Sequence, residues 1–233
     1  MKTNATIINA TPNKNLIINK IQKSFEKGML NVGVKTYPIN LRELNIQPCR
    51  GCTNKIDFRS TKICKINDSM QSLYSILQDS EIWVFITQLI DTEISNKFYN
   101  FLDRLEPLFQ PNYKTINQTD IYLKSINTTG KIILISLDNN EIINKTEIIS
   151  KQLKMIADIF DKKILSTIFY NQLALLEFSY GINNTQTNNN SNMFEIFELA
   201  GQQAIKQNNF SKEILQLISI TSETKKRNSK KNY

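Results

Sequence analysis

Residues 82–86 read Ile-Trp-Val-Phe-Ile, the most continuous apolar run in this chain of 233 residues. A short, uniformly apolar run of this kind predicts a central parallel strand that helices cover on both faces. Residues 131–136, Lys-Ile-Ile-Leu-Ile-Ser, predict a second such strand, and residues 5–10, Ala-Thr-Ile-Ile-Asn-Ala, a third. We expect these three runs to form the interior of one sheet.

Helical patterns alternate with these strands along the chain. Apolar residues at helical spacing predict helices over 16–28, 68–77, 94–105, 141–160 and 193–208. Two weaker strands are expected near 33–39 and 163–169. Five alternations of strand and helix predict right-handed βαβ units and an α/β fold. With the first, third and fourth strands inside, the five-stranded parallel sheet has the order 2-1-3-4-5, as in a flavodoxin-like three-layer sandwich.

The pattern shows one domain over residues 1–221 and a basic tail at 222–233. Residues 224–233 contain five Lys and Arg and no acidic residue, so removing these five charges from the net charge of +8 leaves +3 for the rest. We expect the tail to be disordered and solvated, with an anionic partner as the alternative. Nucleic-acid binding is not expected of a body that is only mildly basic.

The composition excludes several classes of chemistry. The chain contains no histidine, which rules out Ser-His-Asp and Cys-His catalysis, an imidazole general base and histidine metal ligands. No apolar stretch has the length of a membrane span, and the start lacks the apolar segment of a secretory signal. We therefore expect a cytoplasmic protein without membrane contact, whose three cysteines are reduced.

The sheet order also predicts where a ligand binds. Parallel sheets bind ligands outside the carboxyl ends of their strands, near the point where the strand order reverses. Here that point lies between the first and third strands, beside the loops 9–16, 87–94 and 137–141. The first loop offers a hydroxyl, amides, a lysine and N–H groups at a helix start, which suit a phosphate monoester. An ordinary turn with a helix cap is the alternative interpretation.

Three further stretches of sequence carry a family resemblance. Residues 46–52 read Ile-Gln-Pro-Cys-Arg-Gly-Cys, residues 64–70 read Cys-Lys-Ile-Asn-Asp-Ser-Met, and residues 101–104 read Phe-Leu-Asp-Arg. They resemble the Pro-Cys-x-Gly-Cys…Cys-x-x-x-Asp-x-Met and Phe-x-Asp-Arg segments of the NAD(P)H-dependent FMN reductases and iron–sulfur flavoproteins of the flavodoxin-like superfamily. The resemblance extends over most of residues 4–170.

This resemblance implies an oxidoreductase with bound FMN. It implies NAD(P)H as electron donor, a flavin, quinone or similar small molecule as electron acceptor, and a homodimer. The hydride chemistry would belong to the cofactor, which needs no histidine. On the three loops, the implied cofactor-binding residues are Thr11, Pro12, Asn13, Lys14, Asn15, Thr87, Gln88, Leu89, Ile90, Leu137, Asp138, Asn139 and Asn140. The phosphate is expected at the first helix, near Thr11, Asn13 and Asn15.

The same loops depart from the family pattern. The family's Ser-Pro-Arg is Thr-Pro-Asn at 11–13, its Ser/Thr-Pro-x-Tyr is Thr-Gln-Leu-Ile at 87–90, and its Thr-x-Gly-Gly is Leu-Asp-Asn-Asn at 137–140. These departures leave a second hypothesis open: a flavodoxin-like protein without flavin that serves as a binding or assembly subunit. An electron-carrying flavodoxin is less favoured, because such carriers are usually strongly acidic.

The cysteines and the Asp-Arg pair are interpreted as structural. Iron–sulfur relatives need a further thiolate where this chain has Lys55, so we predict neither a cluster nor another metal at Cys49, Cys52 and Cys64. Buried thiols are favoured, with a disulfide between the first two as an alternative. Asp103-Arg104 is expected to form an ion pair or helix cap, and the long connection 106–130 a lid or a dimer contact.

Overall fold

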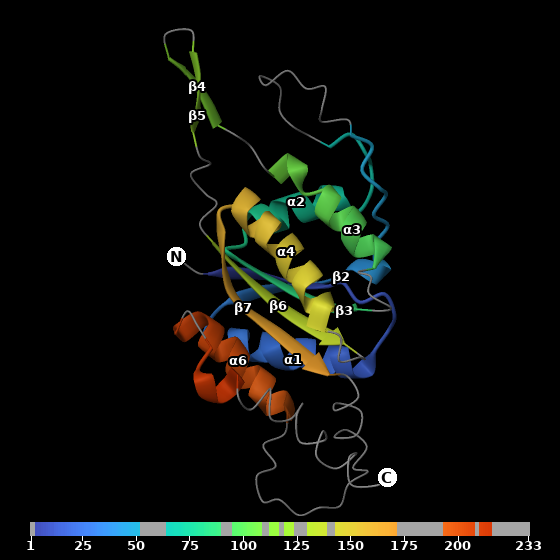
Figure 1. Cartoon of the computed structure of the whole chain (residues 1–233), viewed down its shortest axis with the longest axis vertical. Coiled ribbons are helices and arrows are strands. Elements are labelled where there is room, and N and C mark those ends of the chain that lie inside the picture. Colours follow the sequence, from blue (N-terminus) through green and yellow to red (C-terminus); the bar gives the residue numbers. More distant parts are fainter. Residues whose placement is uncertain are drawn as a thin grey trace, which may run out of the picture.

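The chain folds into three layers, with a sheet between two sets of helices (Figure 1). The computed structural model describes residues 3–51, 64–89, 95–108, 112–116, 119–123, 130–138, 143–171, 193–207 and 210–215. Ile90, Asn139, Asn140, Cys52, Lys55 and the basic tail at 222–233 lie outside these ranges. In the described ranges, no helix has the length and apolar character needed to cross a membrane.

The central sheet confirms the predicted order. Its five strands pair in parallel as β2-β1-β3-β6-β7. Their bounds are β1 (Asn4–Asn9), β2 (Lys35–Asn40), β3 (Ile82–Leu89), β6 (Gly130–Asp138) and β7 (Lys162–Asn171). The three most apolar runs occupy the interior of the sheet, because only there are both faces of a strand covered. The fold is flavodoxin-like.

The five main helices lie close to their expected positions. They are α1 (Leu16–Asn31), α2 (Met70–Gln78), α3 (Asn96–Asp103), α4 (Ile143–Ile159) and α6 (Met193–Lys206), with two 3₁₀ turns, η1 (Leu41–Glu43) and η3 (Glu106–Leu108). In Figure 1, α1 and α6 lie on one face of the sheet, and α2, α3 and α4 on the other. Each face therefore has its own buried cluster.

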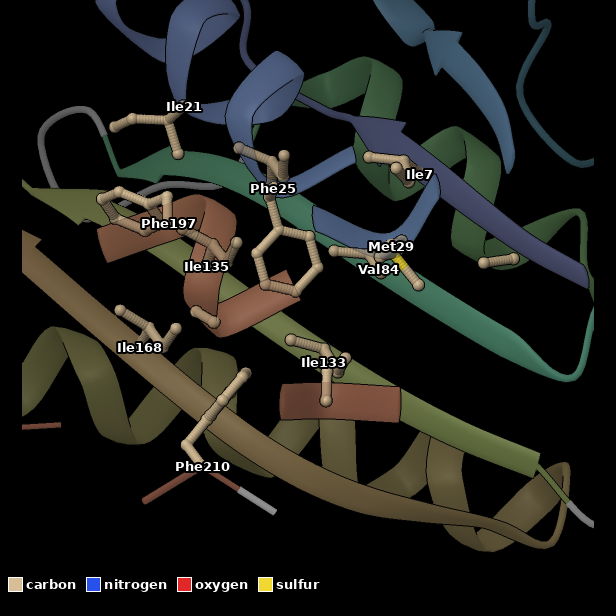
Figure 2. Packing of buried hydrophobic residues seen from close by; sticks show 14 of the residues in the cluster. Ile7, Ile21, Phe25, Met29, Val84, Ile133, Ile135, Ile168, Phe197 and Phe210 are labelled. Carbon is tan, nitrogen blue, oxygen red and sulfur yellow. The ribbon is translucent and has the colours of Figure 1, made fainter. Parts of the chain in front are cut away.

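The α1–α6 face packs with unusually close helix contact. Figure 2 shows Phe25 and Met29 of α1 and Phe197 of α6 lying over the apolar side chains of the sheet, in one buried cluster. A Cβ atom at Gly28 would collide with the carbonyl oxygen of Glu198, and one at Gly201 with that of Phe25. Two glycines thus let the backbones of α1 and α6 touch.

The opposite face is rich in aromatic rings. The ring centroids of Trp83 and Phe160 lie 5.1 Å apart, and those of Phe85 and Phe98 lie 5.5 Å apart. Phe101 of α3 joins the same cluster. Trp83 is therefore a core residue, and α3 and α4 are held over β3 by ring packing.

The connection 106–130 contains regular structure that the sequence did not predict. It contains an antiparallel hairpin of β4 (Asn112–Ile116) and β5 (Thr119–Leu123), in which Tyr113 lies opposite Tyr122. The hairpin projects from the body of the molecule on the side of α2, α3 and α4 (Figure 1).

Candidate functional site

The candidate site lies where β1, β3 and β6 end. The strand order reverses between β1 and β3, as the sequence predicted. The ladder continues one step beyond β1, because the Ala10 N–H donates to the carbonyl oxygen of Ile86 at 2.7 Å. The first loop therefore leaves the sheet directly beside β3.

The last residue of β1, Asn9, organises this first loop. Its side chain is fully buried, and its Oδ1 accepts hydrogen bonds from the Thr11 N–H at 3.1 Å and the Thr11 hydroxyl at 2.5 Å. Its Nδ2 donates to Gln22 Oε1 of α1 at 2.8 Å. The sequence analysis did not single out Asn9 or Gln22. The available signal was an asparagine two residues before Thr11, which is typical of an Asx turn.

The start of α1 is capped by the chain itself. Asn15 Oδ1 accepts from the N–H groups of Ile17 and Ile18 at 2.9 and 3.2 Å. Asn15 therefore performs the capping role that the alternative interpretation expected. Asn13 and Lys14 are exposed, and in the described chain their backbone N–H groups have no acceptor. Those two groups and the Lys14 ammonium are open to an anion.

The second and third loops begin later than predicted, because β3 continues to Leu89 and β6 to Asp138. Two buried hydroxyls lie in these strand ends. Thr87 of β3 and Ser136 of β6 are paired in the sheet register, and both are fully buried. Among the residues that the structure describes, neither Thr87 Oγ1 nor Ser136 Oγ has a hydrogen-bond partner. A buried hydroxyl without a partner costs about 1–3 kcal/mol of stability. Thr87 was among the predicted site residues, whereas Ser136 was not.

These two hydroxyls and Ala10 lie side by side across the ends of β1, β3 and β6, and all three side chains are small. Ala10 follows β1 at the same level, whereas the row beneath contains Ile8, Phe85 and Leu134. By strand alternation, both hydroxyls face the side of the sheet that α2, α3 and α4 cover. Two buried hydroxyls and the small Ala10 therefore replace the large apolar side chains before the strands end.

The other predicted residues of these loops have different positions. Gln88 is buried, and Leu137 belongs to the apolar cluster under α1 and α6, so its side chain is part of the core. Leu89 and Asp138 are register partners at the ends of β3 and β6. Pro12 is half-buried in the first loop.

Ser95 fixes the start of α3 beside this edge. Its hydroxyl donates to the carbonyl oxygen of Ala10 at 2.9 Å and accepts from the Phe98 N–H at 3.3 Å. One side chain thus caps α3 and ties it to the end of β1.

Arg104 joins the three stretches that carry the family resemblance. Its Nη1 and Nη2 atoms donate to the two carboxylate oxygens of Asp68 at 2.8 and 3.0 Å, and both side chains are almost fully buried. Nη1 also donates to the carbonyl oxygen of Gln47 at 3.0 Å. The structural interpretation of the arginine holds, but its partner is Asp68, because Asp103 is exposed.

The Asp68 carboxylate is held in its charged form. Burial by itself would raise the pKa of Asp68. The hydrogen bonds from Arg104 and from the N–H groups of Gln47 and Met70 outweigh burial and keep the pKa below its ordinary value. The ion pair therefore persists across the neutral range.

The described cysteines have unlike surroundings. Cys64 is buried, as expected, but Cys49 is exposed, because the backbone at 47–51 runs along the surface. Both are free thiols. Within the described ranges, no three Cys, Asp or Glu side chains gather into a group that could hold a metal ion.

Known structures share this fold. No protein-family model and no curated protein matches the sequence. An FMN-dependent NADH-azoreductase from Bacillus anthracis, solved with FMN, is similar with a TM-score of 0.56 and 15% identity over 86% of this chain and 99% of that one. An NAD(P)H:quinone oxidoreductase from Methanothermobacter marburgensis is similar with a TM-score of 0.53 and 10% sequence identity, over 88% of this chain and 98% of that one. An NADH:FMN oxidoreductase in its apo form has a TM-score of 0.53 and 10% sequence identity, over 87% of this chain and 90% of that one. At these identities the likeness shows the fold.

Proposed function

We propose that this chain is an FMN-dependent NAD(P)H oxidoreductase that passes electrons to a flavin, quinone or similar acceptor. The observation that carries the proposal is the buried, unpartnered pair of hydroxyls of Thr87 and Ser136 at the carboxyl edge of the sheet. Ligands of such sheets bind at this edge. The named activities of the structural neighbours support the same reading.

The residues present fit FMN at both of its ends. The exposed Lys14 and the N–H groups of Asn13 and Lys14 would hold the phosphate. The Thr11 hydroxyl is already engaged with Asn9, and Asn15 caps α1. We therefore assign the phosphate to the loop backbone and Lys14 rather than to those two side chains.

FMN, when bound, accepts a hydride from NAD(P)H and passes electrons on. This chain would bind the phosphate, orient the ring at the ends of β3 and β6, and keep water from the two buried hydroxyls. Ser95 and Asn9 would hold the first loop and α3 at a fixed spacing around the ring, through their bonds to Ala10 and Thr11. None of these roles needs a histidine.

The alternative, a subunit without flavin, has its own observation. Asn15 occupies two of the N–H groups at the start of α1, which leaves fewer donors for a phosphate. If that loss is decisive, the fold serves in binding or assembly. Titration with FMN separates the two functions.

We also propose that the chain acts as a homodimer in the cytoplasm. Met155 and Ile159, one turn apart on α4, are 63% and 46% exposed, which suits a covered face. The free thiols of Cys49 and Cys64 suit a reducing compartment. Light scattering of the purified chain measures the oligomeric state.

The deciding experiment is a titration of apo-protein with FMN, followed by flavin fluorescence. We expect saturable binding, flavin that is partly lost during purification, and bleaching of bound flavin by NAD(P)H. No saturable binding up to about 100 μM, which corresponds to about −5.5 kcal/mol, would refute the oxidoreductase proposal. The subunit alternative would then take its place.

A further inference from the structure

We propose that Thr87 and Ser136 together bind the polar edge of the flavin ring through their side-chain hydroxyls. This inference rests on the proposed function and deepens it, because it assigns ring recognition to two specific atoms. It also assigns a role to Ser136, which no sequence pattern indicated.

The comparison with other buried hydroxyls is the first argument. The described chain contains five Ser or Thr side chains that are at least 98% buried, namely Thr6, Thr11, Ser80, Thr87 and Ser136. Thr6 and Ser80 share a hydrogen bond of 2.6 Å, and the Thr11 hydroxyl donates to Asn9. The two hydroxyls without a partner are therefore neighbours in the sheet, and both lie near its carboxyl edge.

The chemistry of two adjacent hydroxyls is the second argument. Each can donate one hydrogen bond and accept others, so the pair can meet a ligand edge that alternates acceptors and donors. The edge of a flat heterocycle such as a flavin ring carries this pattern of acceptors and donors. A phosphate suits the pair less well, because no cationic side chain adjoins it among the described buried residues.

The cost of the arrangement is the third argument. A buried hydroxyl that lacks a partner destabilises the protein, and a ligand that supplies the partner removes that cost. A hydroxyl that serves only stability would behave in the opposite way, because its removal would break a hydrogen bond and destabilise the apo-protein. Stability of the apo-protein and affinity for flavin should therefore respond in opposite directions.

The test compares Thr87→Val and Ser136→Ala with the control Thr6→Val. Thr6 is equally buried and faces the same side of the sheet, but its hydroxyl is bonded to Ser80. We expect both pair variants to melt, as apo-proteins, at or above the wild-type temperature, and to bind FMN about tenfold more weakly. Riboflavin, which lacks the phosphate, should lose affinity by the same factor. Thr6→Val should melt at a lower temperature and bind FMN normally.

Each other outcome has a defined meaning. Lower melting temperatures for both pair variants would show that the hydroxyls already have partners, such as bound water, and would overturn the inference. Unchanged FMN affinity in both variants would also overturn it, while leaving the proposed function intact. A wild-type chain that binds neither FMN nor riboflavin would instead refute the proposed function. Thr87→Ser, which keeps the hydroxyl, should bind FMN like the wild type.

Discussion

A single lysine at the amino edge of the sheet makes stability depend on pH. Lys162 Nζ lies 4.5 Å from the centroid of the Trp83 ring and 3.4 Å from the carbonyl oxygens of Ser80 and Glu81. Burial lowers its pKa from 10.5 to about 8, and the nearby Glu81 charge opposes this only in part. Because the folded pKa is depressed, the unfolded chain binds a proton between these two values that the folded chain does not.

The free energy of unfolding should therefore fall as the pH is lowered from 10.5 to 8, and then level off. The Trp83 ring favours the ammonium, so we expect a change of about 2–3 kcal/mol. Urea titrations of the wild type and Lys162→Met at pH 8 and pH 10 measure it. The difference between the two proteins should change with pH. Parallel pH profiles would show that Lys162 keeps its ordinary pKa in the fold.

The ion pair of Arg104 and Asp68 should be costly to break from one side. Arg104→Leu leaves the buried Asp68 carboxylate unpaired, which we expect to cost about 3–5 kcal/mol in urea denaturation. Adding Asp68→Asn should recover part of that loss. The control is Lys27→Ala, whose pair with Glu198 is 65% and 21% exposed and should contribute about 0–1 kcal/mol. Equal losses in the two single variants would contradict the proposed importance of burial.

At the scale of elements, the contact between α1 and α6 reverses the usual effect of a Gly→Ala substitution on helix stability. Gly→Ala within a helix normally stabilises by about 1 kcal/mol. Gly28→Ala should instead destabilise by about 1–3 kcal/mol, because the new methyl group meets the carbonyl oxygen of Glu198. Thermal unfolding beside Lys23→Ala, on the exposed side of the same helix, measures the effect. A stabilised Gly28→Ala would mean that the helices can separate without loss.

The predictability of the elements follows from how much tertiary context each one needs. The strands at 82–89 and 130–138 contain the unbroken apolar runs 82–86 and 132–135, so the sequence alone predicts that they are buried. The hairpin of β4 and β5 was not predicted, because its strands mix polar and apolar residues and the sequence between them, Asn117-Gln118, contains no glycine that would mark a tight hairpin. The same holds for the candidate site. Thr87 was predicted from its position after an apolar run, whereas Ser136 is recognised only in the structure, by its buried hydroxyl without a partner.

At the scale of the whole molecule, the two faces of the sheet are completed by different parts of the chain. The α2–α3–α4 face uses residues from Ile8 to Phe160, while the α1 face needs Phe197 and Phe210 near the other end of the sequence. This division explains why alternation of strands and helices was enough to predict the layers. It was not enough to predict which helices touch through their backbones.

The backbone contact of α1 with α6 has a consequence for synthesis on the ribosome. Phe25 and Met29 leave the ribosome early, but Phe197, which belongs to the same buried cluster, is added some 170 residues later. At about 5–20 residues per second, the nascent chain carries this apolar surface for roughly ten seconds or more. During that time chaperones that hold exposed apolar segments can bind α1. A chain whose synthesis ended before α6 would have α1 and part of one sheet face without their apolar cover, and such a chain is prone to aggregate.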